Sequence, residues 1–206
     1  MGKSRKKKIR LNLMVTSVGS KKVKTAVFIS GTGSNLKSLI KFSHQKKSPI
    51  SIQLIISNDP KAKGLKLGNF YQIKKKVFSL NGNNLDEKKT ILELNKNKID
   101  LICLAGFMKI LSKNFIKNFK GKILNIHPSL LPKFKGLHTH KRVLKSKQKI
   151  TGCTVHFVNA KLDSGKIILQ KKVNITKKDN EKTLTKKVLT QEHKLYPRAI
   201  LKLFNP

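Results

Sequence analysis

Acidic residues are scarce in this chain: its 206 residues include nine Asp and Glu against 47 Lys and Arg, which gives a formal net charge of +38. Tryptophan is absent, and the two cysteines, Cys103 and Cys153, lie in apolar runs typical of strands. We therefore expect buried free thiols and a reducing compartment, not a disulfide framework. No run of about 18 apolar residues occurs, so no transmembrane helix is predicted.

Arginine is also scarce, and this decides between two interpretations of the charge. A lysine-rich surface attracts phosphates, which would indicate a nucleic acid or another anionic partner. Sites selected to read phosphates or bases usually use arginine forks, but only Arg5, Arg10, Arg142 and Arg198 are present. The lysines are spread over most of the chain without interleaved aromatic residues. Compositional drift therefore explains the charge better than a nucleic-acid partner, although small anions should still be attracted.

A basic tail precedes the rest of the chain. Residues 1–22 lack acidic residues, and their apolar core is too short for a secretory signal, although the composition resembles that of a transit peptide. We expect a disordered extension there. The remaining residues, 23–206, have a length that suits one α/β domain with a substantial core.

Apolar runs with the period of a strand alternate with runs that have the period of a helix. We predict strands at residues 26–30, 50–57, 77–80, 99–105, 123–126, 152–158 and 167–173. We predict helices at residues 36–44, 64–71, 85–97, 141–145 and 181–204, with Pro197 bending or interrupting the last, and one more helix capped by Ser112. Repeated βα units imply an α/β fold with a single doubly wound, mostly parallel, Rossmann-like sheet. Helices should cover both faces, with the site at the carboxyl ends of the strands.

A glycine-rich loop, Gly31-Thr32-Gly33-Ser34-Asn35, follows the first predicted strand and opens a helix. Glycines let the backbone approach an anion closely, and a helix N-terminus presents free N–H groups and a positive dipole. The loop matches neither the GxGxxG dinucleotide pattern nor a P-loop. It is either a cradle for a monophosphate or an ordinary capped turn, and the loop alone does not separate these two interpretations.

Three polar residues at strand ends carry the clearest chemical signal. Asn125 and His127 share one face of a strand because side chains repeat every two residues, and Pro128 ends that strand. Asp163 is one of the few acidic residues and precedes Ser164-Gly165. An amide, an imidazole and a carboxylate can bind an oxyanion, move a proton and tune the proton donor, as acyl or formyl transfer requires. The alternatives are a structural histidine and an aspartate that caps a turn.

Other polar residues give weaker signals. Glu192 is isolated, and taken alone it indicates a surface helix residue paired with a nearby lysine. His138 and His140 have the spacing of a metal pair but no carboxylate or cysteine beside them, so no metal is expected. His44 and His156 carry no usable signal.

Together these motifs resemble the phosphoribosylglycinamide formyltransferases, which are folate-dependent enzymes of purine synthesis. The resemblance rests on the order and spacing of residues 27–36, 104–111, 124–132, 136–140, 152–158, 162–165 and 190–193. It implies that Asn125, His127 and Asp163 are catalytic. It implies that the phosphate and glycinamide are bound by Gly33, Ser34, Asn35, Leu189, Thr190, Gln191 and Glu192. It implies that the folate is bound by Met108, Lys109, Ile110, Leu111, Asn125, Asn159, Ala160, Lys161, Leu162 and Asp163.

The resemblance also implies a reaction. A formyl group would pass from the co-substrate 10-formyltetrahydrofolate to the amine of 5′-phosphoribosylglycinamide through a tetrahedral intermediate, without a metal. It further implies small-molecule partners, no membrane association, a cytoplasmic location and a monomer or homodimer. The family commonly has arginine in place of Lys109, which changes the donor geometry beside the folate.

Three alternatives stay open at this point. Methionyl-tRNA formyltransferase shares the core motif around Asn125 and His127, but normally has a second, C-terminal domain. Formyltetrahydrofolate hydrolase would use water as the acceptor, so a phosphate loop would have no purpose. A non-catalytic, basic RNA-binding protein on this scaffold would have no reason to keep the three polar residues.

Overall fold

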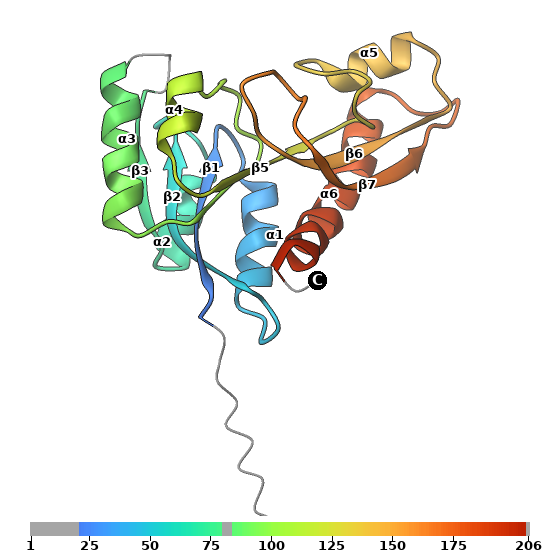
Figure 1. Ribbon diagram of the computed structural model, residues 1–206. Helices are drawn as coiled ribbons and strands as arrows, with labels where there is room; N and C mark the ends of the chain where they lie inside the picture. Colours follow the sequence, from blue (N-terminus) through green and yellow to red (C-terminus); the bar gives the residue numbers. More distant parts are fainter. Residues whose placement is uncertain (1–20, 80–83, 205–206) are drawn as a thin grey trace, which may run out of the picture.

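A sheet of seven strands forms the centre of the described molecule (Figure 1). The computed structural model describes residues 21–79 and 84–204. The extension expected at residues 1–22 therefore lies outside the described residues, apart from Lys21 and Lys22. Among the described residues, no helix is both long and apolar enough to cross a membrane.

The elements alternate along the chain as the sequence predicts, with bounds that differ by a few residues. The strands are β1 (Val23–Ile29), β2 (Ile50–Ser57), β3 (Lys74–Val77), β4 (Leu101–Leu104), β5 (Lys122–His127), β6 (Ile150–Phe157) and β7 (Ile167–Asn174). The helices are α1 (Ser34–Ser43), α2 (Leu65–Phe70), α3 (Asn84–Lys96), α4 (Lys113–Asn118), α5 (Thr139–Lys145) and α6 (Glu181–Phe204). The predicted cap of α4 is confirmed, because Ser112 Oγ accepts the N–H of Phe115 at 3.0 Å.

The strand order is β3-β2-β1-β4-β5-β6-β7. Neighbouring strands from β3 to β5 are parallel, whereas β5-β6 and β6-β7 are antiparallel. Most of β1 and all of β4 are buried apolar runs, as expected for parallel strands covered on both faces. The predicted doubly wound, mostly parallel α/β fold is thus confirmed. Cys103 and Cys153 are buried and free, also as predicted.

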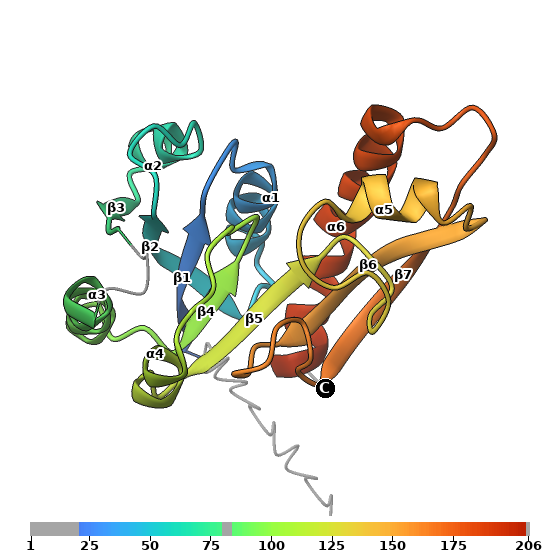
Figure 2. The same cartoon turned by 90° about the horizontal axis from the view of Figure 1, so that it is seen from above.

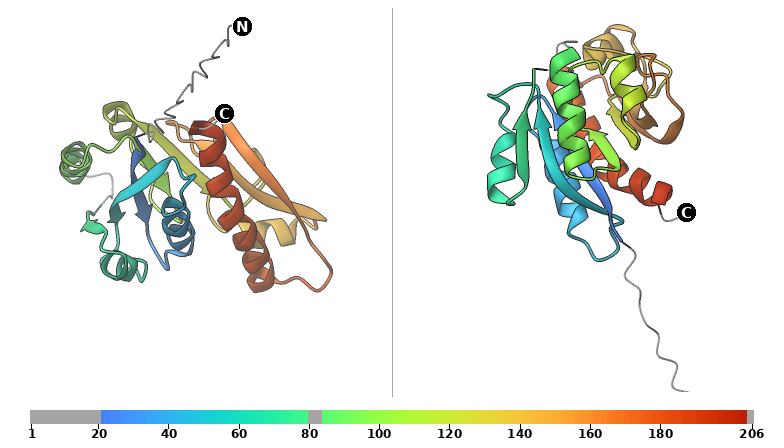
Figure 3. Two further views of the ribbon diagram at one scale, coloured as in Figure 1. Left: turned by 90° about the horizontal axis from the view of Figure 1, so that it is seen from below. Right: turned by 60° about the vertical axis from the view of Figure 1, so that its left-hand side comes forward.

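Helices cover both faces of the sheet, and each face has its own apolar core. One core packs α1 and α6 against the sheet, with Leu39 and Tyr196 among its buried residues. The other core packs α3 and α4, through Leu94 and Phe115, against the opposite face. Figures 2 and 3 show these helical layers on either side of the sheet, with α6 running beside α1.

Two predictions about the elements are corrected. The third strand, predicted at residues 77–80, is β3 at Lys74–Val77, and residue 80 lies outside the described residues. All four residues of β3 are exposed at the sheet edge, where lysines are tolerated, so apolar character does not mark this strand. Of the two effects predicted for Pro197, interruption is wrong, because α6 runs continuously from Glu181 to Phe204, whereas a bend stays a prediction. The burial of Tyr196 and Ala199 beside Pro197 offsets the hydrogen bond that proline cannot donate.

Candidate active site

A cavity of about 950 Å³ lies outside the carboxyl ends of β1, β4 and β5. The chain first builds the sheet from β1 toward β3 and then continues on the other side of β1 with β4. The cavity opens at this point, between β1 and β4. Open parallel sheets bind ligands at such points, because the segments that leave neighbouring strands diverge there. The walls come from the loops after these strands, the segment that opens α5, the loop between β6 and β7, and the first half of α6.

The glycine-rich loop after β1 forms one part of the wall and leads into α1. Gly33 has φ +76°, and a side chain there would come within 2.7 Å of Gly64 Cα, so only glycine fits. The first bond within α1 runs from the N–H of Lys37 to the carbonyl of Gly33 at 2.8 Å. The N–H groups of residues 34–36 therefore have no partner within the helix and lie at the positive end of its dipole. Such a terminus suits an anion.

Glu192 of α6 lines the same part of the cavity. It is 6% exposed, and Asn35 Nδ2 donates to its Oε2 at 2.7 Å. Burial raises the pKa of Glu192 to about 7, and the hydrogen bond from Asn35 opposes that increase. Asn35 Oδ1 is buried and has no hydrogen-bond partner among the described residues. The surface position expected for Glu192 taken alone is therefore wrong, because this face of α6 packs against α1.

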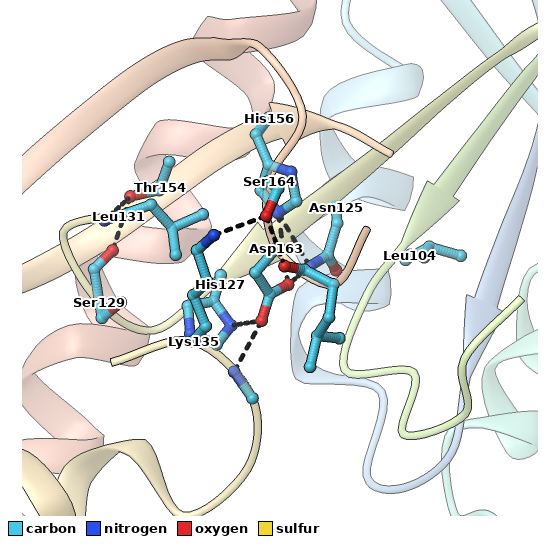
Figure 4. A network of polar contacts seen from close by, with 12 residues as sticks. Leu104, Asn125, His127, Ser129, Leu131, Lys135, Thr154, His156, Asp163 and Ser164 are labelled. Atoms are coloured by element: carbon cyan, nitrogen blue, oxygen red, sulfur yellow. Dashed lines mark hydrogen bonds and ion pairs between the residues drawn. The ribbon is translucent and has the colours of Figure 1, made fainter. Parts of the chain in front are cut away.

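Asp163 and His127 meet on another part of the cavity wall (Figure 4). Their side chains are 8% and 7% exposed, and Asp163 Oδ2 lies 3.4 Å from His127 Nδ1. On the other side of the ring, His127 Nε2 lies 2.9 Å from the carbonyl oxygen of Phe134. Both ring nitrogens face acceptors, and only the imidazolium form can donate to both. The structure thus brings together two residues that lie far apart in the sequence, in a geometry suited to a charged imidazole.

Asn125 and His156 complete this cluster. The two residues are directly paired across the antiparallel strands β5 and β6. Asn125 Nδ2 lies 3.2 Å from His156 Nε2 and donates to Asp163 Oδ1 at 3.4 Å. His156 Nδ1 lies 2.8 Å from the carbonyl oxygen of Phe157, so Nδ1 carries the proton and Nε2 accepts from Asn125. Burial lowers the pKa of His156, which favours this neutral form. The sequence alone does not single out His156, because the register of β5 against β6 is its only signal.

Asp163 also joins two loops. Its Oδ2 accepts the N–H of Gly136 at 2.8 Å, and close by Lys135 Nζ donates to Ser164 Oγ (Figure 4). Asp163 has φ +44°, in the left-handed region that residues other than glycine rarely adopt. Residues held in such conformations cluster at functional sites, where the surrounding contacts offset the strain. The carboxylate is therefore fixed by the loops around it as well as by its polar neighbours.

A further part of the cavity wall is apolar and open. Met108, Ile110 and Leu162 line it although they are 62%, 72% and 50% exposed. Exposed apolar side chains gathered at a cavity indicate a ligand with an apolar surface. All residues predicted to bind folate line the cavity, namely Met108, Lys109, Ile110, Leu111, Asn125, Asn159, Ala160, Lys161, Leu162 and Asp163.

Two predicted site residues do not reach the cavity. Thr190 and Gln191 lie on α6 between Leu189 and Glu192, which both line it. A helix turns about 100° per residue, so positions three apart share a face and the two residues between them point elsewhere. Thr190 Oγ1 instead donates to the carbonyl of Lys186 at 2.9 Å.

His138 and His140 line the cavity where α5 begins. Burial lowers the pKa of His140, and its Nδ1 is buried without a partner among the described residues. His140 therefore offers a neutral ring with an unused nitrogen. Within residues 21–79 and 84–204, no group of three or more His, Cys, Asp or Glu side chains is placed to hold a metal ion.

Comparison with known proteins gives the class of this site. A family model described as formyl transferase matches residues 23–200, and the chain belongs to this family. The phosphoribosylglycinamide formyltransferase of Haemophilus influenzae is 43% identical over 86% of this chain and 85% of its own length. Within the family, the chain thus belongs to the phosphoribosylglycinamide formyltransferases.

Solved structures agree with this membership. The crystal structure of phosphoribosylglycinamide formyltransferase from Brucella melitensis has a TM-score of 0.83 and 41% identity, and covers 89% of this chain and 96% of its own. The corresponding structure from Anaplasma phagocytophilum has a TM-score of 0.80 and 39% identity, with coverages of 87% and 86%. The human trifunctional purine biosynthetic protein adenosine-3 is 43% identical over 89% of this chain, but the chain spans 18% of that protein's length.

Proposed function

We propose that this protein transfers a formyl group from 10-formyltetrahydrofolate to the amine of 5′-phosphoribosylglycinamide, a step of purine synthesis. The observation that carries this proposal is the contact of Asn125, His127 and Asp163 on the wall of a cavity that also holds an anion-binding helix terminus. The N-terminus of α1 suits the phosphate of a phosphorylated amine, and the cluster of Asn125, His127 and Asp163 suits formyl transfer. Residues 23–206 act as one domain in this reaction.

The acceptor binds beside α1 and α6. Gly33, Ser34 and Asn35 hold its phosphate through backbone N–H groups at the helix N-terminus. Glu192, next to Leu189, accepts hydrogen bonds from the hydroxyl or amine groups of the acceptor, and the amide of Asn35 orients its carboxyl group. Thr190 and Gln191 support this part of α6 without touching the substrate, because they do not line the cavity.

The folate is held by Met108–Leu111 and by residues 159–163. The exposed apolar side chains of Met108, Ile110 and Leu162 suit its ring system, and the cavity volume of about 950 Å³ lies within the range of such sites. The partners are small molecules, and no metal or nucleic acid takes part. The buried free thiols of Cys103 and Cys153 suit action in the cytoplasm, as a monomer or homodimer.

The cluster of Asn125, His127 and Asp163 carries out the chemistry. The neutral amine attacks the formyl carbon, and the tetrahedral intermediate carries an oxyanion. The imidazolium of His127 leaves its contact with Phe134 and donates to this oxygen. The amide of Asn125 turns one proton from Asp163 to the same oxygen and keeps its bond to His156. Asp163 stabilises the imidazolium across 3.4 Å. As the bond from the formyl carbon to the folate nitrogen breaks, that nitrogen gains the proton that the amine loses, with His127 as the carrier.

One assay tests the proposal. The full-length protein is incubated with 10-formyltetrahydrofolate and with phosphoribosylglycinamide, initiator methionyl-tRNA or no acceptor, and the folate product is followed by absorbance. We expect product only with phosphoribosylglycinamide. Product only with the tRNA would identify a methionyl-tRNA formyltransferase, and equal product without acceptor would identify a hydrolase. No product together with salt-sensitive RNA binding would identify an RNA-binding protein.

A further inference from the structure

We infer that Ser30 is a positioning residue that fixes the folate-binding segment Met108–Leu111 through its hydroxyl group. This inference rests on the proposed function. Ser30 lies between the end of β1 and Gly31, it is half-buried, and it is not among the residues that line the cavity. Its side chain therefore acts on the neighbouring segment and not on a ligand.

The hydrogen bonds of Ser30 join three neighbouring strands at their carboxyl ends. The N–H of Ser30 donates to the carbonyl of Gly106 at 3.1 Å, and its Oγ accepts the N–H of Met108 at 2.8 Å. The single hydroxyl proton is then free for another partner, and Oγ donates it to Asn58 Oδ1 at 2.5 Å. Asn58 follows β2 and Met108 follows β4, so these bonds run in the strand order β2-β1-β4.

Phe107 packs edge-on against Phe28 in the core, and the bond from Met108 to the hydroxyl stands at the start of the exposed residues that follow. Gly106 has φ +72°, so the backbone turns sharply as it leaves β4, and Met108 is 62% exposed. The other end of the segment is held differently, because Leu111 is buried and Ser112 caps α4. The hydroxyl of Ser30 therefore sets where the segment begins, and with it the position of the backbone that faces the folate.

The phosphate side has anchors that do not need this hydroxyl. The carbonyl of Gly31 accepts the N–H of Gly64 at 2.9 Å, and Gly33 packs closely on Gly64. The bond from the N–H of Ser30 to Gly106 also survives removal of the side chain. Loss of the hydroxyl should therefore weaken folate binding selectively, an effect that general destabilisation would not produce.

The test compares full-length wild type, Ser30→Ala, Ser30→Thr and Ser43→Ala. Ser43 is a matched control, since its Oγ donates to the carbonyl of Ile40 at 2.8 Å and it is buried at the far end of α1. Calorimetric titrations use a non-reactive 10-formyl folate analogue and, separately, phosphoribosylglycinamide. Ser30→Ala should weaken analogue binding roughly tenfold and change phosphoribosylglycinamide binding by less than about twofold. Ser30→Thr keeps the hydroxyl and, like Ser43→Ala, should bind both as wild type does.

The possible outcomes are distinct. Unchanged analogue binding by Ser30→Ala, or equal weakening of both ligands, overturns the inference and leaves the proposed function standing. A wild type that does not bind the analogue overturns the proposed function, and this role with it. If Ser30→Ala does not fold, Asn58→Ala removes the acceptor that orients the hydroxyl. It should weaken analogue binding alone by about threefold, and equal weakening of both ligands contradicts the inference.

Discussion

Two buried carboxylates on the wall of one cavity have different partners, and the difference separates chemistry from binding. Asp163 lies between His127 Nδ1 and the N–H of Gly136. Glu192 has the neutral amide of Asn35, and burial raises the pKa of Glu192 to about 7. Donors around a carboxylate stabilise its anion, whereas desolvation favours its protonated form. We therefore propose that Asp163 stabilises charge during the reaction and that Glu192 hydrogen-bonds the acceptor.

Two other acids of the same chain show what is special about Asp163 and Glu192. Glu93 pairs with Lys74 and Asp179 pairs with Lys187, each at 2.6 Å. Among the described residues, neither Asp163 nor Glu192 has a lysine within ion-pair distance. In a chain with 47 basic residues, this separation keeps two carboxylates available for a ligand or a histidine.

The largest expected effect comes from Asp163→Asn. This change removes the negative charge that stabilises the imidazolium of His127, so kcat should fall roughly 10³-fold. Steady-state kinetics measure the fall, with circular dichroism to show that the fold is intact. Asp100→Asn is the control, an acid-to-amide change at an exposed residue just before β4, at the end of that strand away from the cavity, and it should leave kcat unchanged. A folded Asp163→Asn protein with kcat within about tenfold of wild type would remove Asp163 from the mechanism.

The second effect is a dependence of stability on pH. The pKa of Glu192 rises from its ordinary 4.5 to about 7 on folding, so the folded protein binds more protons between these values. Its contribution to stability is therefore full below pH 4.5 and is lost as the pH rises through 7. The loss is on the order of 3 kcal/mol. Glu192→Gln should not show this loss. In urea unfolding, the free energy of unfolding of this variant should therefore increase relative to that of wild type from about pH 5 to about pH 8. If the free energies of unfolding of the two proteins change in parallel with pH, Glu192 is not desolvated in the folded state.

A smaller effect should follow from His156, which accepts from Asn125 Nδ2 on the Asp163 side of the cavity. His156→Phe removes this acceptor and should lower kcat by about tenfold, because the amide of Asn125 is then held only by its long hydrogen bond to Asp163. His156→Gln places a carbonyl oxygen near the position of Nε2 and should restore most of the rate. Equal loss in both variants would indicate a packing role instead of an acceptor role.

The smallest effect is expected at Lys135. Its ammonium group contacts the exposed Ser164 beside Asp163, and exposed polar contacts of this kind contribute little. Lys135→Met should change kcat by less than about twofold, measured in the same assay. A larger loss would show that the field at Asp163 includes this lysine.

The fold was largely predictable because buried parallel strands are apolar runs. The bounds of β2, Ile50–Ser57, match the prediction at both ends. The edge strand β3 lies three residues before its predicted position, because its pairing is held by the backbone while three of its four exposed side chains are lysines. A periodicity of apolar side chains cannot mark a strand that buries none of them.

The site was predictable in its residue types but not in its contacts. Asn125 and His127 stand at a strand end, as the sequence predicts, whereas Asp163 lies in the loop between β6 and β7 and not at a strand end. The pairing of Asn125 with His156 depends on an antiparallel register between β5 and β6, which no local pattern gives. A continuous stretch of sequence does not separate Thr190 and Gln191 from Leu189 and Glu192, whereas a helix turns only one of its faces toward a cavity.

The most direct measurement compares kcat and the KM for phosphoribosylglycinamide in Asp163→Asn and Glu192→Gln under the same conditions. If Asp163 serves the chemistry and Glu192 binds the acceptor, Asp163→Asn should lose kcat with little change in KM. Glu192→Gln should raise KM by about tenfold or more, with a much smaller change in kcat. The same parameter changing by the same factor in both variants would contradict this division of the cavity.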